Sequence, residues 1–377
     1  MAASFLSLAG AGLVSAFALA GAIDAPLRDP EATPASTPPA AWAAEAAGRL
    51  SVQEQVGQLI VGAFDGVRTP SSLTSALRSG RLSGVILFGA NVASSTQLRR
   101  LTHSVQDAAG GSALVSVDQE GGIVRRIPFA APREGQPAQG SVPRVRRIAG
   151  QAATDLRSLG INVNLAPVAD VPSSPGADIR PRAFAGGAAA IADKVAAAVR
   201  GYRAGRVAAT AKHFPGLGAA ARNTDDASVV IRRSAAQLRR ADLLPFRSAV
   251  AARAPLIMVS HASYPALDRR RIASQSGRVV TDLLRKEMGF DGAVITDALE
   301  ASAVLARSSL TGAAQRSLMA GCDLLLVTRP SSPGKVIRRL VERATTSRRI
   351  RVRVQQAAAR VLALKRTLGL PQSQPRR

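Results

Sequence analysis

The chain has 377 residues, of which 46% are hydrophobic and 20% charged, which suits one large α/β barrel or two ordinary domains and excludes a wholly disordered protein. Fifty basic residues against 25 acidic ones give a net charge of +25. Aromatic residues make up only 3% of the chain, so the stacking surfaces that single-stranded nucleic acids require are scarce, and we expect no nucleic-acid partner. The positive charge instead favours electrostatic association with anionic cell-wall polymers.

The N-terminal region has the composition of a targeting segment and a tether. Residues 1–22 are apolar and uncharged and end in small residues at 20–22, which is typical of a secretory signal peptide with its cleavage site. An uncleaved membrane anchor is the alternative. Residues 23–46 are rich in alanine, proline and threonine, which predicts a flexible spacer. We therefore expect a protein that is secreted or associated with the cell envelope.

Eight short apolar runs follow the spacer and alternate with helical patterns, as parallel strands joined by helices do. The runs cover residues 58–64, 84–89, 113–117, 161–168, 207–214, 255–261, 292–297 and 322–327. Their number and spacing predict a single (β/α)8 TIM barrel, regular or imperfect, over residues 47–370, followed by a basic tail at 371–377. A doubly wound sheet is the alternative architecture.

The segments between the runs carry the periodicity of surface helices. Residues 192–204 and 277–288 have apolar side chains at spacings of three and four, so each presents one face to the barrel. A last helix is predicted over residues 351–368, with its arginines on a solvated outer face. Residues 129–143 are expected to form a long irregular loop after the third strand. The single cysteine, Cys322, excludes an intrachain disulfide and is expected to be buried.

Ionisable residues gather where the apolar runs end, and in a TIM barrel the active site lies at the carboxyl ends of the strands. They are Asp118 and Glu120 after the third run, Asp170 and Arg182 after the fourth, Lys212 and His213 in the fifth, His261 at the end of the sixth and Asp297 at the end of the seventh. Each alone has a structural interpretation, such as a turn cap or a hydrogen-bonded residue at the barrel mouth. Their shared location predicts an active site.

The histidines do not have the spacing of a metal site. The chain holds three, and they form neither an H-x-H pair nor an H-E-x-x-H helix. We therefore expect a reaction that uses no metal and no cofactor.

Five stretches of the sequence resemble glycoside hydrolase family 3, above all its single-domain β-N-acetylglucosaminidase (β-hexosaminidase) branch. They are SVDQEGGIVRRI (116–127), NVNLAPVADV (162–171), AKHFPGLG (211–218), MVSHASYPALD (258–268) and LLRKEMGFDGAVITDAL (283–299). The resemblance covers residues 50–330, in the order that the family has.

The resemblance implies a set of site residues. Asp297 falls on the family's catalytic nucleophile, which forms a covalent glycosyl-enzyme in a retaining mechanism. Five further residues fall on positions that hold the hydroxyl and N-acetyl groups of the sugar, and His261 completes the predicted substrate-binding set. The five are Asp118, Arg126, Arg182, Lys212 and His213.

One loop departs from the pattern of this branch, where a D-x-H dyad supplies the general acid/base. By count, Asn223 stands where the dyad has its aspartate and Asp225 where it has its histidine, and Leu217 replaces another usual histidine. We expect Asp225, with Asp226 as the alternative, to be the acid/base, its pKa raised by burial and by the nucleophile. The glycines of residues 216–226 suit a loop that moves over the barrel mouth.

The function predicted from these observations is hydrolysis of terminal β-linked N-acetylglucosamine, with retention, from peptidoglycan fragments during peptidoglycan recycling or from chitooligosaccharides. A β-glucosidase or β-xylosidase of the same family is one alternative. A non-catalytic sugar-binding protein of the envelope is the other, because the acid/base loop is altered.

Overall fold

The computed structural model describes residues 39–372. In this part of the chain eight parallel strands pair in the order β10-β1-β2-β3-β6-β7-β8-β9, and a bridge between Ile295 and Leu324 joins the two ends of the sheet. The strands are β1 (Ile60–Gly62), β2 (Gly84–Leu87), β3 (Leu114–Val117), β6 (Val163–Asn164), β7 (Ala208–Phe214), β8 (Leu256–Val259), β9 (Ala293–Thr296) and β10 (Leu325–Val327). Each lies within one predicted run. The TIM barrel is confirmed and the doubly wound sheet is excluded, because an open sheet keeps two unpaired edges.

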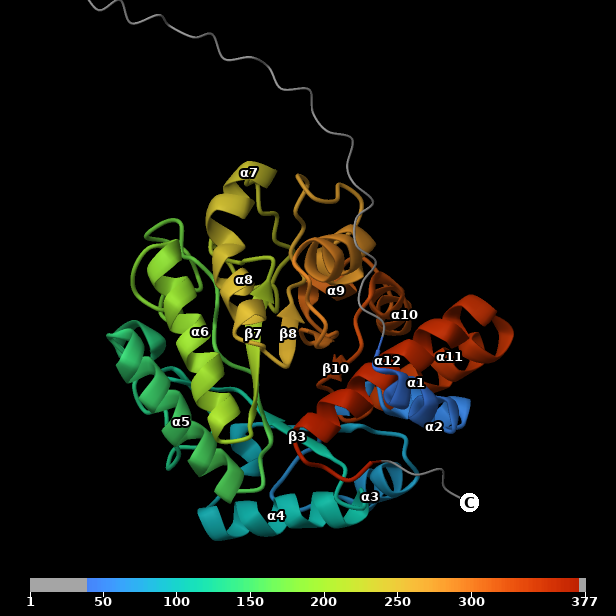
Figure 1. The fold of residues 1–377 in the computed structure, drawn as a ribbon. Helices are drawn as coiled ribbons and strands as arrows, with labels where there is room; N and C mark the ends of the chain where they lie inside the picture. The colour runs from blue at the N-terminus through green and yellow to red at the C-terminus, as the bar shows by residue number, and fades with distance from the viewer. Residues whose placement is uncertain (1–38, 373–377) are drawn as a thin grey trace, which may run out of the picture. The chain divides into compact units, whose positions relative to one another are not determined.

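Helices surround these strands (Figure 1). They are α1 (Ala41–Gly48), α2 (Val52–Gly57), α3 (Ser71–Arg78), η1 (Gly89–Asn91), α4 (Ser95–Ala108), η2 (Gln136–Ala138), α5 (Val142–Ser158), α6 (Ala188–Ala204), α7 (Ala235–Gln237), η3 (Leu238–Asp242), α8 (Leu244–Ala251), η4 (Ala273–Gln275), η5 (Arg278–Glu287), α9 (Ser302–Leu305), α10 (Leu310–Ala320), α11 (Pro333–Thr346) and α12 (Arg348–Thr367). The three predicted helices correspond to α6, η5 and α12. The predicted loop after β3 is irregular apart from η2, until α5 begins at Val142.

The barrel strands bury both of their faces. On β2, Ile86 belongs to the apolar cluster inside the barrel, whereas Val85 and Leu87 belong to the cluster between the strands and the helices. Because successive side chains of a strand point to opposite faces, a strand buried on both sides must be apolar throughout. The continuous apolar runs of the sequence have this physical cause.

Helix α12 covers the end of the barrel at which the strands begin. Its residues Val361, Leu364 and Leu368 join the apolar cluster of the barrel interior, together with Leu256 at the start of β8 and Ala293 at the start of β9. The opposite end, where the strands finish, carries the ionisable residues described below.

The arginines of α12 are not all solvated, and the prediction was wrong for two of them. Arg353 donates to the carboxylate of Asp323 over 2.8 Å, and Arg360 lies 3.9 Å from the same carboxylate. Asp323 is fully buried and also pairs with Arg285 of η5. A buried carboxylate without cationic partners is costly, so these arginines turn inward to neutralise it.

The last part of the predicted spacer is helical. Helix α1 starts at Ala41, buries Ala43 and Ala47, and places Trp42 under the guanidinium of Arg366 at 4.4 Å from the ring centroid. The predicted signal peptide or anchor at 1–22 and residues 23–38 of the spacer lie outside the described residues. Among residues 39–372 no helix is both long and apolar enough to cross a membrane.

Candidate active site at the barrel mouth

Four charged side chains form a network where β3 and β7 end. Lys212, in β7, donates to Asp118 over 2.6 Å and lies 2.7 Å from Glu120. Arg182 completes the network through a bidentate contact with Glu120, at 2.9 Å from Nε and 2.7 Å from Nη2. The structure thus brings together three residues with predicted roles through a fourth, Glu120, to which no role was assigned.

Two members of this network are buried and two are partly exposed. Lys212 and Glu120 are almost completely buried, whereas the side chains of Asp118 and Arg182 remain 17% exposed. Burial alone would raise the pKa of Glu120, but Lys212 and Arg182 lower it to about 2. Burial alone would lower the pKa of Lys212, but Asp118 and Glu120 raise it. Glu120 is therefore ionised and Lys212 protonated at neutral pH, and Asp118 and Arg182 are the members of the network that a ligand can reach.

Asp297 follows β9, and one of its carboxylate oxygens accepts the backbone N–H of Ala298 over 2.8 Å. The other oxygen lies 3.9 Å from Nε2 of His213, and the side chain is 18% exposed. Burial alone would raise the pKa of Asp297, but His213, His261 and the Ala298 N–H lower it below its usual value. An ionised carboxylate that a ligand can reach has the state that a nucleophile requires.

His213 is held from behind by a buried carboxylate. Its Nδ1 lies 2.8 Å from Asp170, whose side chain has no exposed surface. Asp170 also accepts the backbone N–H of Leu217 over 2.7 Å. The imidazole therefore has one nitrogen fixed by Asp170 and the other turned toward Asp297.

His261 was predicted to bind substrate, but the structure places it behind the turn that carries Asp297. Its Nδ1 lies 2.8 Å from the hydroxyl of Ser274, its Nε2 lies 3.0 Å from the carbonyl oxygen of Ala298, and the residue has no exposed surface. Burial lowers its pKa, although Asp297 acts in the opposite direction. With both nitrogens engaged, His261 supports the turn that carries Asp297 rather than presenting a donor to a sugar.

Arg126 follows a small hairpin, β4 (Gln119–Gly121) and β5 (Val124–Arg125), that extends the loop after β3. The side chain is half-buried, and its Nε is buried with no hydrogen-bond partner among the described residues. A buried donor without a partner is costly, so Arg126 is suited to donate a hydrogen bond to a ligand oxygen at this position.

The loop with the predicted acid/base is hydrogen-bonded to the segment that follows Asp297. The carbonyl oxygen of Asp225 accepts the N–H of Ser302 over 3.0 Å, and that of Thr224 accepts the N–H of Ala303 over 3.1 Å. Partial burial, Asp297 and Asp226 raise the pKa of Asp225 to about 6, although His213 acts in the opposite direction. Solvent still reaches the side chain. Asp226 is also exposed, and its backbone N–H bonds within the loop.

The two glycines of this loop serve close packing and not movement. A Cβ on Gly218 would lie 1.7 Å from the carbonyl oxygen of Val171, and one on Gly216 would lie 2.8 Å from Cβ of Asp242. The carbonyl oxygen of Gly216 also accepts the hydroxyl of Tyr264 over 2.9 Å. The first part of the loop is therefore fixed against the barrel, contrary to the expectation of a hinge.

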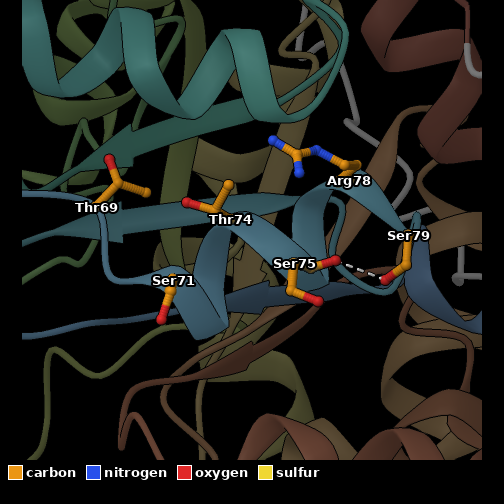
Figure 2. Close-up of a pocket in the computed structure, with 6 residues that line it drawn as sticks. All are labelled: Thr69, Ser71, Thr74, Ser75, Arg78 and Ser79. Atoms are coloured by element: carbon orange, nitrogen blue, oxygen red, sulfur yellow. Dashed lines mark hydrogen bonds between the residues drawn. The ribbon is translucent and has the colours of Figure 1, made fainter.

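A separate hollow of about 500 Å³ lies along α3, away from these residues. Figure 2 shows its lining, which is rich in hydroxyl groups. These groups bond to their own helix, since Thr74 donates to the carbonyl oxygen of Pro70 over 3.2 Å and Ser79 donates to that of Ser75 over 2.8 Å. We assign no function to this hollow, because it lies apart from the ionisable residues at the barrel mouth.

Two residues of the site, Glu120 and Asp170, were counted among the ionisable strand-end residues that predict an active site, but neither was given a role. Both residues follow barrel strands, and this position in the sequence indicates that they belong to the barrel mouth. What each carboxylate contacts depends on neighbouring strands, because Glu120 bonds to residues 62 and 92 positions away and Asp170 to one 43 positions away. In residues 39–372 no group of three or more His, Cys, Asp or Glu is arranged to hold a metal ion.

The chain is similar to several known proteins. Residues 51–364 match the family described as Glycosyl hydrolase family 3 N terminal domain. A β-hexosaminidase of Stenotrophomonas maltophilia is 34% identical over 269 residues, which cover 67% of this chain and 78% of the relative. An uncharacterized secreted glycosyl hydrolase of Arthroderma benhamiae is 34% identical over 306 residues, which cover 76% of this chain and 85% of the relative.

Solved structures show the same likeness. A family 3 β-N-acetylglucosaminidase from Paenibacillus sp. str. FPU-7 superposes with a TM-score of 0.81 at 31% identity, over 85% of this chain and 63% of that one. A β-N-acetylhexosaminidase from Beutenbergia cavernae superposes with a TM-score of 0.78 at 31% identity, over 84% of this chain and 98% of that one. The chain thus spans less than two thirds of the Paenibacillus protein but nearly all of the Beutenbergia protein. It belongs to glycosyl hydrolase family 3 and is a glycoside hydrolase.

Proposed function

We propose that this enzyme is a retaining exo-glycosidase that removes terminal β-linked N-acetylglucosamine, with Asp297 as the nucleophile and Asp225 as the acid/base. The observation that carries the proposal is the opposite perturbation of two carboxyl groups at one barrel mouth. The pKa of Asp297 is lowered, whereas that of Asp225 is raised to about 6, partly by Asp297 itself. Near pH 6 the first group is thereby a carboxylate, whereas a substantial share of the second is still protonated and able to act as an acid.

The reaction follows from these two states. Asp297 attacks the anomeric carbon and forms a glycosyl ester, while Asp225 gives its proton to the departing glycosidic oxygen. The ionised Asp225 then takes a proton from water, and the resulting attack on the anomeric carbon releases Asp297 and the sugar with its original configuration. Neither step needs a metal or another cofactor.

The charged network would hold the sugar while this happens. Asp118 and Arg182 are the partly exposed members, and Arg126 has a buried donor without a partner. Fixed charged hydrogen-bond partners suit a dense array of hydroxyl groups, and those that tighten as charge develops on the sugar lower the barrier. We place His213 beside the nucleophile and Lys212 beneath Asp118 in the same subsite.

The names of several relatives support N-acetylglucosamine as the sugar. The Stenotrophomonas relative is a β-hexosaminidase, and the Paenibacillus structure is a β-N-acetylglucosaminidase. We propose fragments of peptidoglycan or chitooligosaccharides as the polymers from which the sugar is removed. A β-glucosidase or β-xylosidase remains the alternative within the family, and Asp226 remains the alternative acid/base.

The non-catalytic alternative rests on the altered acid/base loop. Against it, the substituted position carries a carboxyl group with a pKa of about 6, whereas an exposed aspartate away from other charges titrates near 4. A surface residue retained after loss of catalysis would have no reason to show this shift. The loop also keeps its two backbone bonds to the segment after Asp297.

A comparison of three aryl glycosides tests the sugar. Initial rates are measured for the 4-nitrophenyl β-glycosides of N-acetylglucosamine, glucose and xylose at equal concentrations. We expect kcat/KM to be highest by a factor of about 100 or more for the N-acetyl sugar, because a buried site that bonds an amide rejects analogues without it. Faster release from the glucoside or xyloside would favour that activity, and no turnover of any of the three would favour a non-catalytic protein.

We also propose that the enzyme associates with anionic polymers through a groove between α5 and α6. The groove measures about 490 Å³ and is lined by Arg146, Arg147 and Arg200, all of them exposed. The lining also includes the small residues Gly150, Ala197 and Gly201. Three positive charges around one groove attract carboxylate or phosphate groups.

Secretion or attachment to the cell envelope is part of the same proposal. It is supported by the sequence of residues 1–22 and by the Arthroderma relative, which is described as secreted. Fractionation of cells that produce the full chain, followed by N-terminal sequencing, distinguishes a cleaved signal peptide from an intact membrane anchor.

A further inference from the structure

The hydrogen-bond partners of the Asp170 side chain are all nitrogen atoms, of Leu217 and His213. One of its oxygens lies 2.8 Å from Nδ1 of His213, and the other accepts the backbone N–H of Leu217 over 2.7 Å. The backbone N–H of His213 lies 3.2 Å from both oxygens. The residue has no exposed surface, so no water substitutes for a lost partner. Both oxygens are therefore in use, each by a different part of the site.

The first oxygen sets the direction of the His213 ring. A carboxylate at Nδ1 keeps a proton on that nitrogen and fixes the plane of the ring, as buried carboxylates do for functional histidines in general. The opposite nitrogen, Nε2, then faces Asp297 at 3.9 Å. His213 is also among the causes that lower the pKa of Asp297.

The second oxygen sets the start of the acid/base loop. Leu217 begins the stretch that leads to Asp225, and its N–H is held by Asp170. The far end of the stretch is held by the bonds from Ser302 and Ala303 to the carbonyl oxygens of Asp225 and Thr224. The position of Asp225 therefore depends on two anchors, of which Asp170 is one.

We propose that Asp170 is a positioning residue that aligns both catalytic carboxyl groups at once, through the His213 ring on one side and the Leu217 end of the acid/base loop on the other. The proposal rests on the proposed function, because it takes Asp297 as nucleophile and Asp225 as acid. Asp170 itself does not contact the substrate, since it is fully buried behind His213.

The substitution Asp170→Asn separates the two tasks with almost no change of volume. An amide has one acceptor and one donor group, so it satisfies either the Leu217 N–H or the His213 Nδ1–H and turns its NH2 against the other. If the NH2 faces the ring, Nδ1 must become the acceptor and the proton moves to Nε2. If it faces Leu217, the loop loses its first anchor.

A matched control is available at the other end of the barrel. Asp323 is also fully buried and also accepts a backbone N–H, from Val294 over 2.9 Å, but its other partners are the structural arginines below the strands. Asp323→Asn therefore measures the general effect of neutralising a buried carboxylate. We expect it to lower the melting temperature and to leave kcat of the folded protein within about twofold of the parent.

The readout that does not depend on activity is the state of the His213 ring. The chain has only three histidines, so the 15N spectrum of histidine-labelled protein is simple, and the variants His103→Gln and His213→Gln assign the signals. We expect Asp170→Asn to shift the ring 15N signals of His213, to leave those of His103 unchanged, and to reduce kcat by about a hundredfold, the scale of losing one preorganised hydrogen bond. Asp323→Asn should change neither.

The outcomes separate the two proposals. If the parent protein fails to hydrolyse any aryl glycoside, the proposed function is wrong, but the ring signals of His213 still report whether Asp170 positions it. If Asp170→Asn keeps the parental kcat and the parental signals of His213, the positioning role is wrong. If the variant does not fold, Asp170→Glu tests the same role, because its longer side chain moves the carboxylate from its place between His213 and Leu217. A folded Asp170→Glu protein with parental kcat and parental signals would also overturn the positioning role.

Discussion

The backbone N–H of Ser302 donates to the carbonyl oxygen of Asp225 over 3.0 Å, which joins the loop of the proposed acid to the segment that follows the proposed nucleophile. The two carboxyl groups therefore come from loops after β7 and β9 that are connected directly, near enough for the charge of Asp297 to raise the pKa of Asp225. The two carboxyl groups can therefore take different roles because the loops after β7 and β9 bond to each other and bring them close together.

Removal of the proposed acid should affect poor leaving groups most. In Asp225→Ala we expect kcat/KM to fall by about 10²- to 10⁴-fold for substrates with alkyl or sugar leaving groups, because general acid catalysis supplies a factor of that size. Activated aryl glycosides need little protonation, so their loss should be small. The measurement is a series of glycosides with graded leaving-group pKa.

Asp226→Ala is the matched control for that series, since it removes the neighbouring carboxyl group from the same loop. We expect it to act like the parent, and we expect added azide to accelerate only Asp225→Ala, because azide attacks the glycosyl-enzyme without a base. Equal small losses in both variants would show that neither residue is the acid.

The pH profile should report the raised pKa of Asp225. Its acid form is required for the first step, so kcat/KM should fall as the pH rises through about 6, the value to which partial burial and Asp297 raise the pKa. In Asp225→Ala this basic limb should disappear for an activated aryl substrate. A basic limb that stays at the same pH in the variant would assign the titration to another group.

The same raised pKa has a consequence for stability. The carboxyl group binds its proton more tightly in the folded protein than in the unfolded chain, so its contribution to folding becomes less favourable as the pH rises from the ordinary aspartate value of about 4 to about 6. We therefore expect Asp225→Asn to raise the melting temperature more at pH 7 than at pH 4, relative to the parent. Equal changes at the two pH values would contradict the shift.

Gly218 should be intolerant of a side chain because the loop packs tightly there. A Cβ would lie 1.7 Å from the carbonyl oxygen of Val171, so Gly218→Ala must displace the loop and should cost about 1–3 kcal/mol in free energy of unfolding. Activity on poor leaving groups should fall with it. Gly176→Ala is the control, since a Cβ there has no neighbour within 4 Å. Chemical denaturation of both variants checks the difference.

The arginine groove predicts a salt-sensitive association with anionic polymers. Replacing Arg146, Arg147 and Arg200 by glutamine should weaken binding to purified cell-wall material at low salt, whereas hydrolysis of a neutral aryl substrate should stay unchanged. A control that replaces Arg338, Arg348 and Arg349, exposed residues of α11 and α12, removes the same charge elsewhere. Equal weakening by both triple variants would mean that net charge and not the groove governs the association.

Much of the architecture could be predicted from the sequence, because a strand that is buried on both faces is apolar at every position. The run around Ile86 is apolar at every position since alternate side chains enter the barrel and the helix layer, and this holds without knowing which strands are neighbours. That Lys212 and Asp118 lie at the same end of the barrel could be predicted from their place at strand ends. Their hydrogen bond could not be predicted, because it spans 94 positions and depends on β3 and β7 lying in one barrel.

Other features could not be predicted because they depend on charges brought together by the fold. Arg360 has the spacing of an outer helix residue, yet it turns toward Asp323 because a buried carboxylate needs cations. His261 stands at a strand end like a ligand of the sugar, yet both of its ring nitrogens are occupied. Gly218 looks like a hinge in the sequence and is a contact point in the structure.

The most direct test of the account is covalent trapping of the nucleophile. The enzyme is incubated with a 5-fluoro derivative of N-acetylglucosaminyl fluoride, which slows hydrolysis of the glycosyl-enzyme, and the labelled peptide is sequenced by mass spectrometry. We predict one sugar per protein, attached to Asp297, and no label in Asp297→Ala, whose kcat should fall by about 10⁴-fold or more while its melting temperature stays near that of the parent. A label on Asp225 or on any other carboxylate would contradict the account.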